Sequence, residues 1–445
     1  MTSLPEPDPS LSYLTPQPAL KGQTLFLGGE LGADDRIYCI PGHNSRVMVI
    51  DPTTDQCVQI GPEYQGKFKW LRGIQACNGV VYGLQCHSPE VLRIDATALE
   101  KVHGRDKEAN PDLADYLDKH VKISTISVPY DIFFEDPEEA KKEKDMIWKY
   151  HGGAISPIDN CIYCIPQSAT RVLRIDPVND KCEFVGPKLE GKYKWYGGLA
   201  AKDGCVYGIP HNSGSVLRIW PKVVGDDVKV EVTLHGDFGE NSHQWHGAGM
   251  CSDGNIVCIP NNVSKVLMIR PAEKGHEEVG PKLEIIGDED VVGTGDNAGR
   301  RDRKYKYLGA MSDTLSNVYC IPSGTERVLR VNTRTNVVDE IGPSLYESGM
   351  ERLKQNKWQN GFYSDVDTSM YAIPLAAETV LKVELTTQNH NSDDEVFPVV
   401  KTLGLPFDPN SNLAKWEGGT KAPNGNMYCM PNNFKKVLKI EPTRV

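Results

Sequence analysis

One module, repeated along nearly the whole chain, limits what this sequence can fold into. Its clearest copy occupies residues 192–221, KYKWYGGLAAKDGCVYGIPHNSGSVLRIWP. Eight copies align on one position of the first apolar run, occupied by Tyr38, Tyr82, Tyr163, Tyr207, Val257, Tyr319, Tyr371 and Tyr428. An aromatic residue precedes this position by twelve or thirteen residues every time, as Phe26, Trp70, Tyr150, Trp195, Trp245, Tyr307, Trp358 and Trp416. Such regular repetition is typical of folds in which similar units stack on one another.

Each copy predicts four short strands, which we name a to d in chain order. Strand a begins at the aromatic residue, strand b is the IYCIP-type run, strand c is the VLRID-type run, and strand d ends in Gly-Pro. Pairs such as Asp203-Gly204 suit the tight turn between a and b, because both positions tolerate a positive φ. Four antiparallel strands in every copy predict an all-β fold, a β-propeller with four-stranded blades.

The two ends of the chain are expected to complete one blade together. The eighth copy stops after strand c, and residues 12–18 stand at the strand d position relative to Phe26. We therefore expect residues 12–18 to close the propeller, since an open array would leave exposed sheet edges. The result is eight blades; a seven-bladed alternative would require one copy to be discarded.

The whole chain is expected to form one domain with a short N-terminal tail and several insertions. The propeller would span 12–445 behind a tail at 1–11. Insertions interrupt the repeat at 96–120, 130–146, 282–303 and 385–395, and only 137–146 suggests a helix.

Composition is that of a soluble globular protein. The chain has 445 residues, a net charge of −11 and a mean hydropathy of −0.42. No apolar stretch approaches the roughly 18 residues of a membrane helix, and the N-terminal segment does not resemble a signal peptide. The acidic balance does not favour binding to nucleic acid or to an anionic membrane.

The cysteines predict buried thiols rather than disulfides or a metal site. Five of the twelve fill one slot before Ile-Pro or Met-Pro, where other copies have glycine or alanine; these five are Cys39, Cys164, Cys258, Cys320 and Cys429. A slot that accepts Cys, Gly or Ala needs a small buried side chain, and no CxxC pair occurs. We expect a cytoplasmic protein without a metal or a cofactor.

The run VLRIDPVND at 172–180 resembles the repeats of YVTN and NHL-type β-propellers. The aromatic residue followed by glycines is similar to the kelch repeat, although kelch has its glycine pair at the end of a strand. The resemblance covers nearly the whole chain and implies the propeller architecture. Propellers of different families are lyases, lactonases, hydrolases or interaction platforms, so the resemblance implies no single activity.

A repeated lysine is the main candidate for a binding site. It stands immediately before the strand a aromatic residue in six of the eight copies, as Lys69, Lys149, Lys194, Lys306, Lys357 and Lys415. If these side chains ring the mouth of the propeller channel, they would bind an anionic small molecule or an acidic peptide. The alternative is that the copies simply inherit a solvated lysine at a strand end.

Histidines in the loops between strands b and c form a second candidate. His43, His87 and His211 occupy these loops, and histidines that converge could act as bases or bind a metal. The simpler interpretation is that these polar loops form turns, because only three copies carry histidine and no carboxylate accompanies it at a fixed spacing. We retain His43 and His211 as candidate ligand-binding residues.

Two further motifs carry less information. His243 and His246 would lie on opposite faces of a strand, which is poor geometry for chelating one metal. The glycine-rich segment 293–299 lacks the GK[ST] ending of a phosphate-binding loop, while the basic residues 300–304 that follow could add to the lysine ring.

The sequence therefore leaves three hypotheses for function. The first is a binding or scaffold protein that recognises an acidic peptide or an anionic small molecule at the channel mouth. The second is an enzyme of the lyase or lactonase type, with a metal or a histidine in the same place. The third is a structural subunit of a larger assembly. The sequence does not indicate an oligomeric state.

Overall fold

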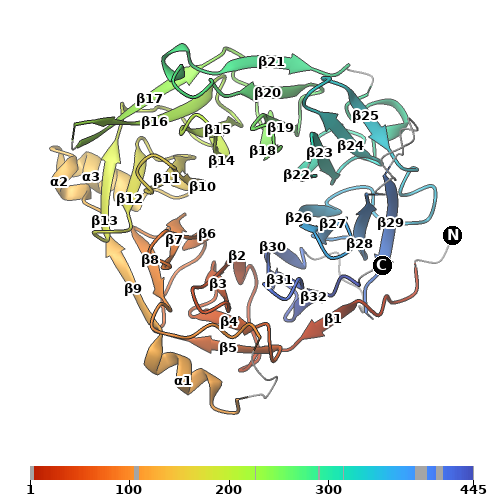
Figure 1. Ribbon diagram of the computed structural model, residues 1–445, viewed down its shortest axis with the longest axis horizontal. Coiled ribbons are helices and arrows are strands. Elements are labelled where there is room, and N and C mark those ends of the chain that lie inside the picture. Colours follow the sequence, from red (N-terminus) through yellow and green to blue (C-terminus); the bar gives the residue numbers. More distant parts are fainter. Residues whose placement is uncertain are drawn as a thin grey trace. The chain divides into compact units, whose positions relative to one another are not determined.

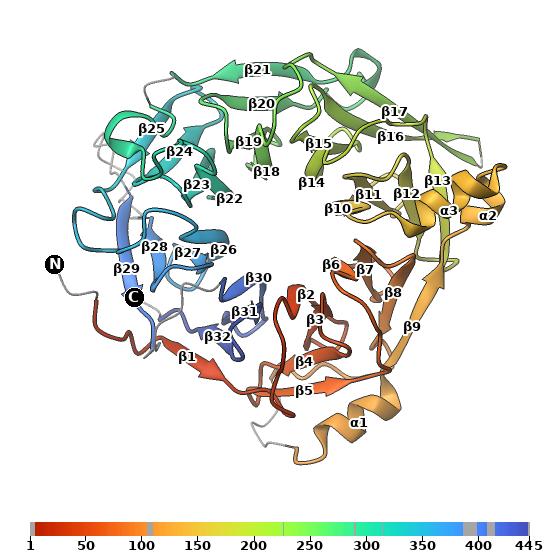
Figure 2. The ribbon, with the colours of Figure 1, turned by 180° about the vertical axis from the view of Figure 1, so that it is seen from behind.

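The computed structural model describes residues 5–104, 110–225, 227–288, 291–313, 315–385, 398–406 and 414–443. They form eight antiparallel sheets of four strands each (Figures 1 and 2). In seven sheets the strand order follows the chain, and the eighth combines the N-terminal strand with the last three strands. The predicted all-β, eight-bladed propeller is therefore confirmed.

Blades 1 to 4 belong to one compact unit, Thr15–Ser242 with Pro271–Pro281, which we call the N-terminal unit. Blade 1 contains β2 (Phe26–Leu31), β3 (Ile37–Pro41), β4 (Val47–Asp51) and β5 (Gln56–Ile60). Blade 2 contains β6 (Trp70–Gln75), β7 (Val81–Gln85), β8 (Glu90–Asp95) and β9 (Lys122–Ser127). Blade 3 contains β10 (Tyr150–Ile155), β11 (Ile162–Pro166), β12 (Val172–Asp176) and β13 (Lys181–Val185). Blade 4 contains β14 (Trp195–Ala200), β15 (Val206–Pro210), β16 (Val216–Val224) and β17 (Asp227–His235).

Blades 5 to 8 belong to the second unit, Met1–Leu14 with His243–Arg270 and Lys282–Val445, which we call the C-terminal unit. Blade 5 contains β18 (Trp245–Met250), β19 (Ile256–Pro260), β20 (Val266–Arg270) and β21 (Lys282–Ile286). Blade 6 contains β22 (Tyr307–Ser312), β23 (Asn317–Pro322), β24 (Val328–Asn332) and β25 (Val338–Ile341). Blade 7 contains β26 (Trp358–Ser364), β27 (Ser369–Pro374), β28 (Thr379–Glu384) and β29 (Val399–Gly404). Blade 8 contains β30 (Trp416–Lys421), β31 (Met427–Pro431), β32 (Val437–Ile440) and β1 (Leu11–Leu14).

Every strand a begins at the predicted aromatic residue, and that side chain is buried. In the tryptophan blades the indole N–H donates to the carbonyl at, or just before, the first residue of strand c; Trp195 Nε1, for example, donates to Ser215 O at 2.7 Å. A bulge follows in each pairing of strands a and b, and in blade 4 it lies between Trp195 and Gly198. Gly197 occupies this bulge with a φ of 79°, a conformation in which side chains are disfavoured.

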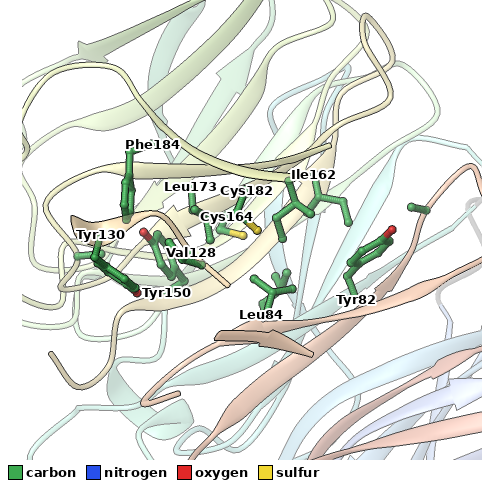
Figure 3. Packing of buried hydrophobic residues seen from close by; sticks show 14 of the residues in the cluster. Tyr82, Leu84, Val128, Tyr130, Tyr150, Ile162, Cys164, Leu173, Cys182 and Phe184 are labelled. Carbon is green, nitrogen blue, oxygen red and sulfur yellow. The ribbon is translucent and has the colours of Figure 1, made fainter. Parts of the chain in front are cut away.

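The small-residue slot lies in the cores between neighbouring blades. Figure 3 shows one such core, to which Tyr82 and Leu84 of β7, Tyr150 of β10, and Ile162 and Cys164 of β11 all contribute. The five cysteines of the slot are all fully buried, and each cysteine of the chain is a free thiol. Burial raises the pKa of the Cys164 thiol well above its usual value, so it is an inert apolar side chain.

The N-terminal strand closes blade 8 as predicted, but its boundaries differ from 12–18. Strand β1 (Leu11–Leu14) pairs antiparallel with β32, with Leu11 opposite Ile440 and Leu14 opposite Val437. The strand stops at Leu14 because Pro16 and Pro18 have no N–H to donate to a ladder. The chain instead reaches blade 1, where Gln17 N donates to Cys57 O at 2.8 Å.

The insertions contain three short helices, one of them at the predicted place. Helix α3 (Pro137–Asp145) lies within the expected segment 137–146, after α2 (Tyr130–Phe133). Helix α1 (Leu113–His120) forms inside insertion 96–120 and packs on blade 1 through the buried Leu113 and Leu117. In both ribbon views α1 lies beside β5 (Figures 1 and 2). None of the described helices is long and apolar enough to cross a bilayer.

The prediction that 282–303 is an insertion is wrong for its first residues. Residues Lys282–Ile286 are strand d of blade 5, paired with β20 from Val266–Ile286 to Arg270–Lys282. The Gly280-Pro281 pair matches the motif expected at the end of strand d, but it precedes the strand and follows a 3₁₀ turn, η1 (Glu277–Val279). A second 3₁₀ turn, η2 (Gly295–Asn297), lies between blades 5 and 6. The insertion expected at 385–395 lies outside the described residues apart from residue 385.

Candidate functional site

The six repeated lysines are buried between consecutive blades. Each of the six residues is at most 4 % exposed: Lys69, Lys149, Lys194, Lys306, Lys357 and Lys415. Each ammonium group donates to carbonyl oxygens in the b–c loop of the preceding blade. Lys69 Nζ in blade 2, for example, donates to Gly42 O at 2.9 Å and to Asn44 O at 2.8 Å in blade 1.

The other copies repeat this contact. In blade 4, Lys194 Nζ donates to Ala169 O and to Gly191 O, both at 3.0 Å. The remaining lysines bind carbonyl groups in the same way: Lys149 to His87, Lys306 to Val263, Lys357 to Thr325 and Lys415 to Ala376. Hydrogen bonds to carbonyl groups are what a buried ammonium needs, because an unpaired buried charge is costly.

The structure thus corrects the expected position of these lysines. They do not form an exposed ring, and we call them the inter-blade lysines. Burial lowers the pKa of Lys69, Lys149, Lys194, Lys306 and Lys357 to about 8. Ligand binding by the inter-blade lysines stays a prediction, and their burial argues against it. The two blades without this lysine, with Leu25 and Gln244 in its place, are the first blades of the two units.

Exposed lysines stand two residues before the buried ones in three blades. The segments 67–70, 192–195 and 304–307 share the pattern Lys-aromatic-Lys-aromatic. The first lysine of each segment is exposed, whereas the second lysine and the second aromatic residue are buried. We call Lys67, Lys192 and Lys304 the outer lysines. The recurrence of the Lys-aromatic-Lys-aromatic pattern in three copies is the sequence signal that could have identified them.

The residue between the two lysine positions has a strained backbone. Its φ is positive in seven blades, and in five of these it carries a ring: Phe68 (47°), Trp148 (55°), Tyr193 (53°), His243 (58°) and Tyr305 (51°). We call these five the rim residues. Left-handed backbone at a bulky residue costs roughly 1–3 kcal/mol and is enriched at functional sites.

Hydrogen bonds hold the rim residues in this conformation. The carbonyl of Phe68 accepts from His87 N at 2.9 Å, and the carbonyl of Trp148 accepts from Ser168 N at 3.0 Å. The neighbouring inter-blade lysine is thereby turned inward. Each rim ring is therefore positioned by the same contacts that join strand a to its b–c loop.

In the N-terminal unit, two rim residues and two loop histidines form one group, which we call the ring cluster. It consists of His43, Phe68, His87 and Trp148, all partly buried. Ring centroids are 4.4 Å apart for His43 and Phe68, and 4.8 Å apart for both Phe68–Trp148 and His87–Trp148. The cluster rests on Leu27, Leu71 and Cys86. The histidine predicted at position 43 is thus brought together with rings that sequence reasoning did not select.

The two imidazoles of the ring cluster are neutral at pH 7. Burial, with Lys67 and Lys69 nearby, lowers the pKa of His43 below its usual value. Burial lowers the pKa of His87 as well, with smaller contributions from Lys149 and His43. Nε2 of each histidine is buried and has no hydrogen-bond partner among the described residues. Each nitrogen atom therefore has an unused hydrogen-bonding capacity inside the cluster.

His211, the second histidine predicted to bind a ligand, belongs to a separate group of rings. It is buried, and its ring centroid lies 5.2 Å from that of Tyr196. Tyr196 in turn stacks on His151 at 3.5 Å. These three side chains come from blades 3 and 4.

The pair His243 and His246 lies at the start of blade 5, in the C-terminal unit. His243 is a rim residue whose ring centroid lies 5.6 Å from that of Tyr305, and its pKa is lowered by burial and by Lys304. Within the described ranges no group of three or more His, Cys, Asp or Glu side chains is arranged to hold a metal ion.

A pocket lies beside each of two outer lysines in the N-terminal unit. The first has a volume of about 410 Å³ and is lined by Tyr64, Lys67, His87 and Glu90, among others. The second occupies the equivalent place in blade 4, with a volume of about 710 Å³. Its walls include Lys192, Asn212, Ser213, Asp237 and Glu240. In both, the d–a connection before a blade faces the b–c loop of that blade.

Comparisons with known proteins identify the fold but no family. No protein-family model matches the sequence. No curated protein matches it either. Among solved structures, virginiamycin B lyase from Staphylococcus aureus is similar, with a TM-score of 0.50 and 11 % identity over 82 % of this chain and 95 % of that chain.

Other similar structures have lower scores. A streptogramin B lyase has a TM-score of 0.48 and 10 % identity over 96 % of both chains. A protein from Lactobacillus plantarum has a TM-score of 0.45 and 11 % identity over 73 % of this chain and 86 % of that chain. At such identities a likeness shows the fold alone. The chain is a β-propeller that resembles virginiamycin B lyase and the YVTN-type propellers in architecture.

Proposed function

We propose that this protein is a ligand-binding β-propeller whose binding surface is the ring cluster together with Lys67 and the adjoining pocket. The ligand is an anion with a planar group, either a small molecule or a side chain of an acidic peptide. The observation that carries this proposal is the position of an exposed lysine beside four packed rings that include two neutral imidazoles.

Each part of this surface suits one part of such a ligand. The faces of Phe68 and Trp148 favour stacking of a planar group, which typically contributes about 1–3 kcal/mol. Lys67 supplies an exposed positive charge, whereas the inter-blade lysines are buried. Its charge-assisted hydrogen bond to a carboxylate or phosphate would be stronger than a hydrogen bond between neutral groups. The buried Nε2 atoms of His43 and His87 lack partners and would fix the orientation of a ligand that enters between the rings, as the few polar groups of a ligand site do.

The strain at the rim residues supports a binding role over a purely architectural one. Thr24 and Asn356 occupy the same left-handed position without a ring, so the blade does not require an aromatic side chain there. Asparagine would adopt this conformation at a lower cost. The fold therefore does not require the rings at positions 68 and 148, which leaves them available for binding.

Titration with naphthalene-2-carboxylate and with its neutral amide tests the proposal. Calorimetry of the wild-type protein is expected to give saturable binding of the carboxylate and weaker binding of the amide. Trp148→Ala should weaken binding of the carboxylate by at least about tenfold, and Lys67→Gln should abolish the preference for the carboxylate.

Tyr116→Ala is a matched control, because Tyr116 is an exposed ring packed beside His120 on α1. It should leave binding unchanged. Equal binding by Trp148→Ala and the wild-type protein would refute the proposed site.

An enzyme is the second candidate, favoured by the neutral imidazoles of the ring cluster. A neutral imidazole with a free Nε2 can act as a general base. His87→Gln should then abolish turnover of any substrate that is found while retaining binding of naphthalene-2-carboxylate. Loss of binding with retained turnover would exclude His87 as the base.

A further inference from the structure

A second charged surface lies in the C-terminal unit, at residues 300–304 between blades 5 and 6. The sequence there is Arg-Arg-Asp-Arg-Lys, and positions 301 to 304 are exposed. Arg300 forms two hydrogen bonds with Asp302, at 2.8 and 2.7 Å, and lies over the ring of Tyr305. This pairing neutralises the only acidic residue of the segment and leaves Arg301, Arg303 and Lys304 uncompensated.

These three cations lack ion-pair partners within the described part of the chain. No carboxylate there lies within salt-bridge distance of Arg301, Arg303 or Lys304. Their positive charge nevertheless affects neighbouring groups. Arg303 contributes to the lowered pKa of Lys306, and Lys304 contributes to the lowered pKa of His243. In a protein with a net charge of −11, such a local excess of positive charge is unusual.

The segment is held in place by the chain that precedes it. Asn297 is 1 % exposed; its Oδ1 accepts from Glu326 N at 2.8 Å and its Nδ2 donates to Tyr307 Oη at 3.1 Å. A side chain at Gly299 would come within 2.7 Å of Lys354 O, so this position requires glycine. The three cations are thus presented from an anchored loop, which reduces the ordering entropy lost on binding.

The backbone of the segment is not arranged to bind a phosphate. Three of its five N–H groups already have acceptors: Arg300 N donates to Gly324 O, Arg303 N to Arg300 O and Lys304 N to Asp302 Oδ1. A phosphate loop needs several free N–H groups that converge on the anion. Recognition therefore depends on the side chains alone, spread over an exposed loop.

We propose that Arg301, Arg303 and Lys304 form a docking surface for an acidic segment of a partner protein. This inference is independent of the ring cluster, which lies in the other unit. Three cations within four residues match closely spaced carboxylates, and Arg presents two N–H donors to each. Nucleic acid is disfavoured as the partner because the rest of the protein would repel a long polyanion.

Fluorescence anisotropy with a labelled ten-glutamate peptide tests this surface. The full-length protein is expected to bind the peptide saturably, more weakly as salt is raised, and not to bind a ten-glutamine peptide. The triple variant R301E/R303E/K304E should lose at least about tenfold in affinity.

The matched control is K141E/K142E/K144E, which makes the same change in charge at three exposed lysines of α3. It should bind the peptide within about twofold of the wild-type protein, and both triple variants should retain the wild-type melting temperature. No saturable binding by the wild-type protein, equal losses in the two triple variants, or tighter binding of a ten-nucleotide single-stranded DNA than of the peptide would overturn the proposal.

Discussion

At the scale of single residues, the two lysines of one short pattern lie in opposite environments. In Lys192-Tyr193-Lys194-Trp195 the first two side chains are exposed and the last two are buried. Sequence reasoning selected Lys194 because it recurs in six copies. One partner of its ammonium group, Ala169 O, lies in another blade, 25 residues earlier in the chain, so the sequence alone could not reveal the burial.

Stability should depend on pH through the inter-blade lysines. Burial lowers the pKa of Lys194 to about 8, while an unfolded lysine has a pKa of about 10.4. Between these values the unfolded state binds more protons, so this residue makes the protein more stable as pH rises. Relative to Lys194→Met, the free energy of unfolding of the wild-type protein should increase by about 2 kcal/mol from pH 7.5 to 9.5.

Urea titrations at the two pH values measure this difference. Lys192→Met is the control, because Lys192 is exposed and should show no such dependence. If the free energies of unfolding of the wild-type protein and Lys194→Met differ by the same amount at both pH values, the ammonium of Lys194 does not titrate in this range.

The strained backbone of a rim residue is expected to lower stability. Tyr193 has a φ of 53° and is 40 % exposed. Tyr193→Asn should leave the melting temperature unchanged or raise it, because asparagine tolerates the left-handed region, whereas Tyr193→Ile should lower it. Thermal unfolding of the two variants provides the measurement. A lower melting temperature for the asparagine variant than for the isoleucine variant would contradict the claim that the backbone at position 193 is strained.

At the scale of elements, the strand pattern was predictable and the connections were not. All eight strands a begin at the aromatic residue that the repeat identifies, because burial of that ring and the bulge after it recur in every blade. Strand β21 was missed because a Gly-Pro pair normally marks the end of strand d. Helix α1 was missed because only Leu113 and Leu117 of its eight residues are buried, so its apolar pattern is short.

The N-terminal strand should contribute measurably to the stability of blade 8. Tyr13 stacks on Trp416 with centroids 5.8 Å apart, contacts Phe434 at 5.1 Å, and donates from its hydroxyl to Pro406 O at 2.8 Å. Tyr13→Ala should lower the free energy of unfolding by about 3 kcal/mol. Tyr116→Ala, which removes an exposed ring from α1, should cost less than about 0.5 kcal/mol. Equal effects in chemical denaturation would mean that β1 does not hold the blade.

At the scale of the whole molecule, the chain consists of two units of four blades. Within each unit, three inter-blade lysines join consecutive blades. Repeat proteins are stabilised mainly by contacts between neighbouring repeats, which are the blades here. Loss of one inter-blade contact should therefore destabilise mainly the two blades that it joins. This arrangement was not visible in the repeat pattern, where the absence of lysine at 25 and 244 looked like ordinary variation.

Hydrogen exchange can detect that locality. Lys306→Met removes the donor to Val263 O and Asn262 O, so amides of blades 5 and 6 should exchange faster while those of blades 1 to 4 keep their wild-type rates. Lys304→Met, two residues earlier and exposed, should change neither set. Uniformly faster exchange in both units would contradict a local role.

The central claim is that the ring cluster binds a planar anion, and intermolecular nuclear Overhauser effects test it most directly. With aromatic residues labelled and naphthalene-2-carboxylate bound, cross-peaks are predicted from the naphthyl protons to the rings of Phe68, His87 and Trp148. A bound ligand that gives cross-peaks only to other parts of the protein would contradict the claim.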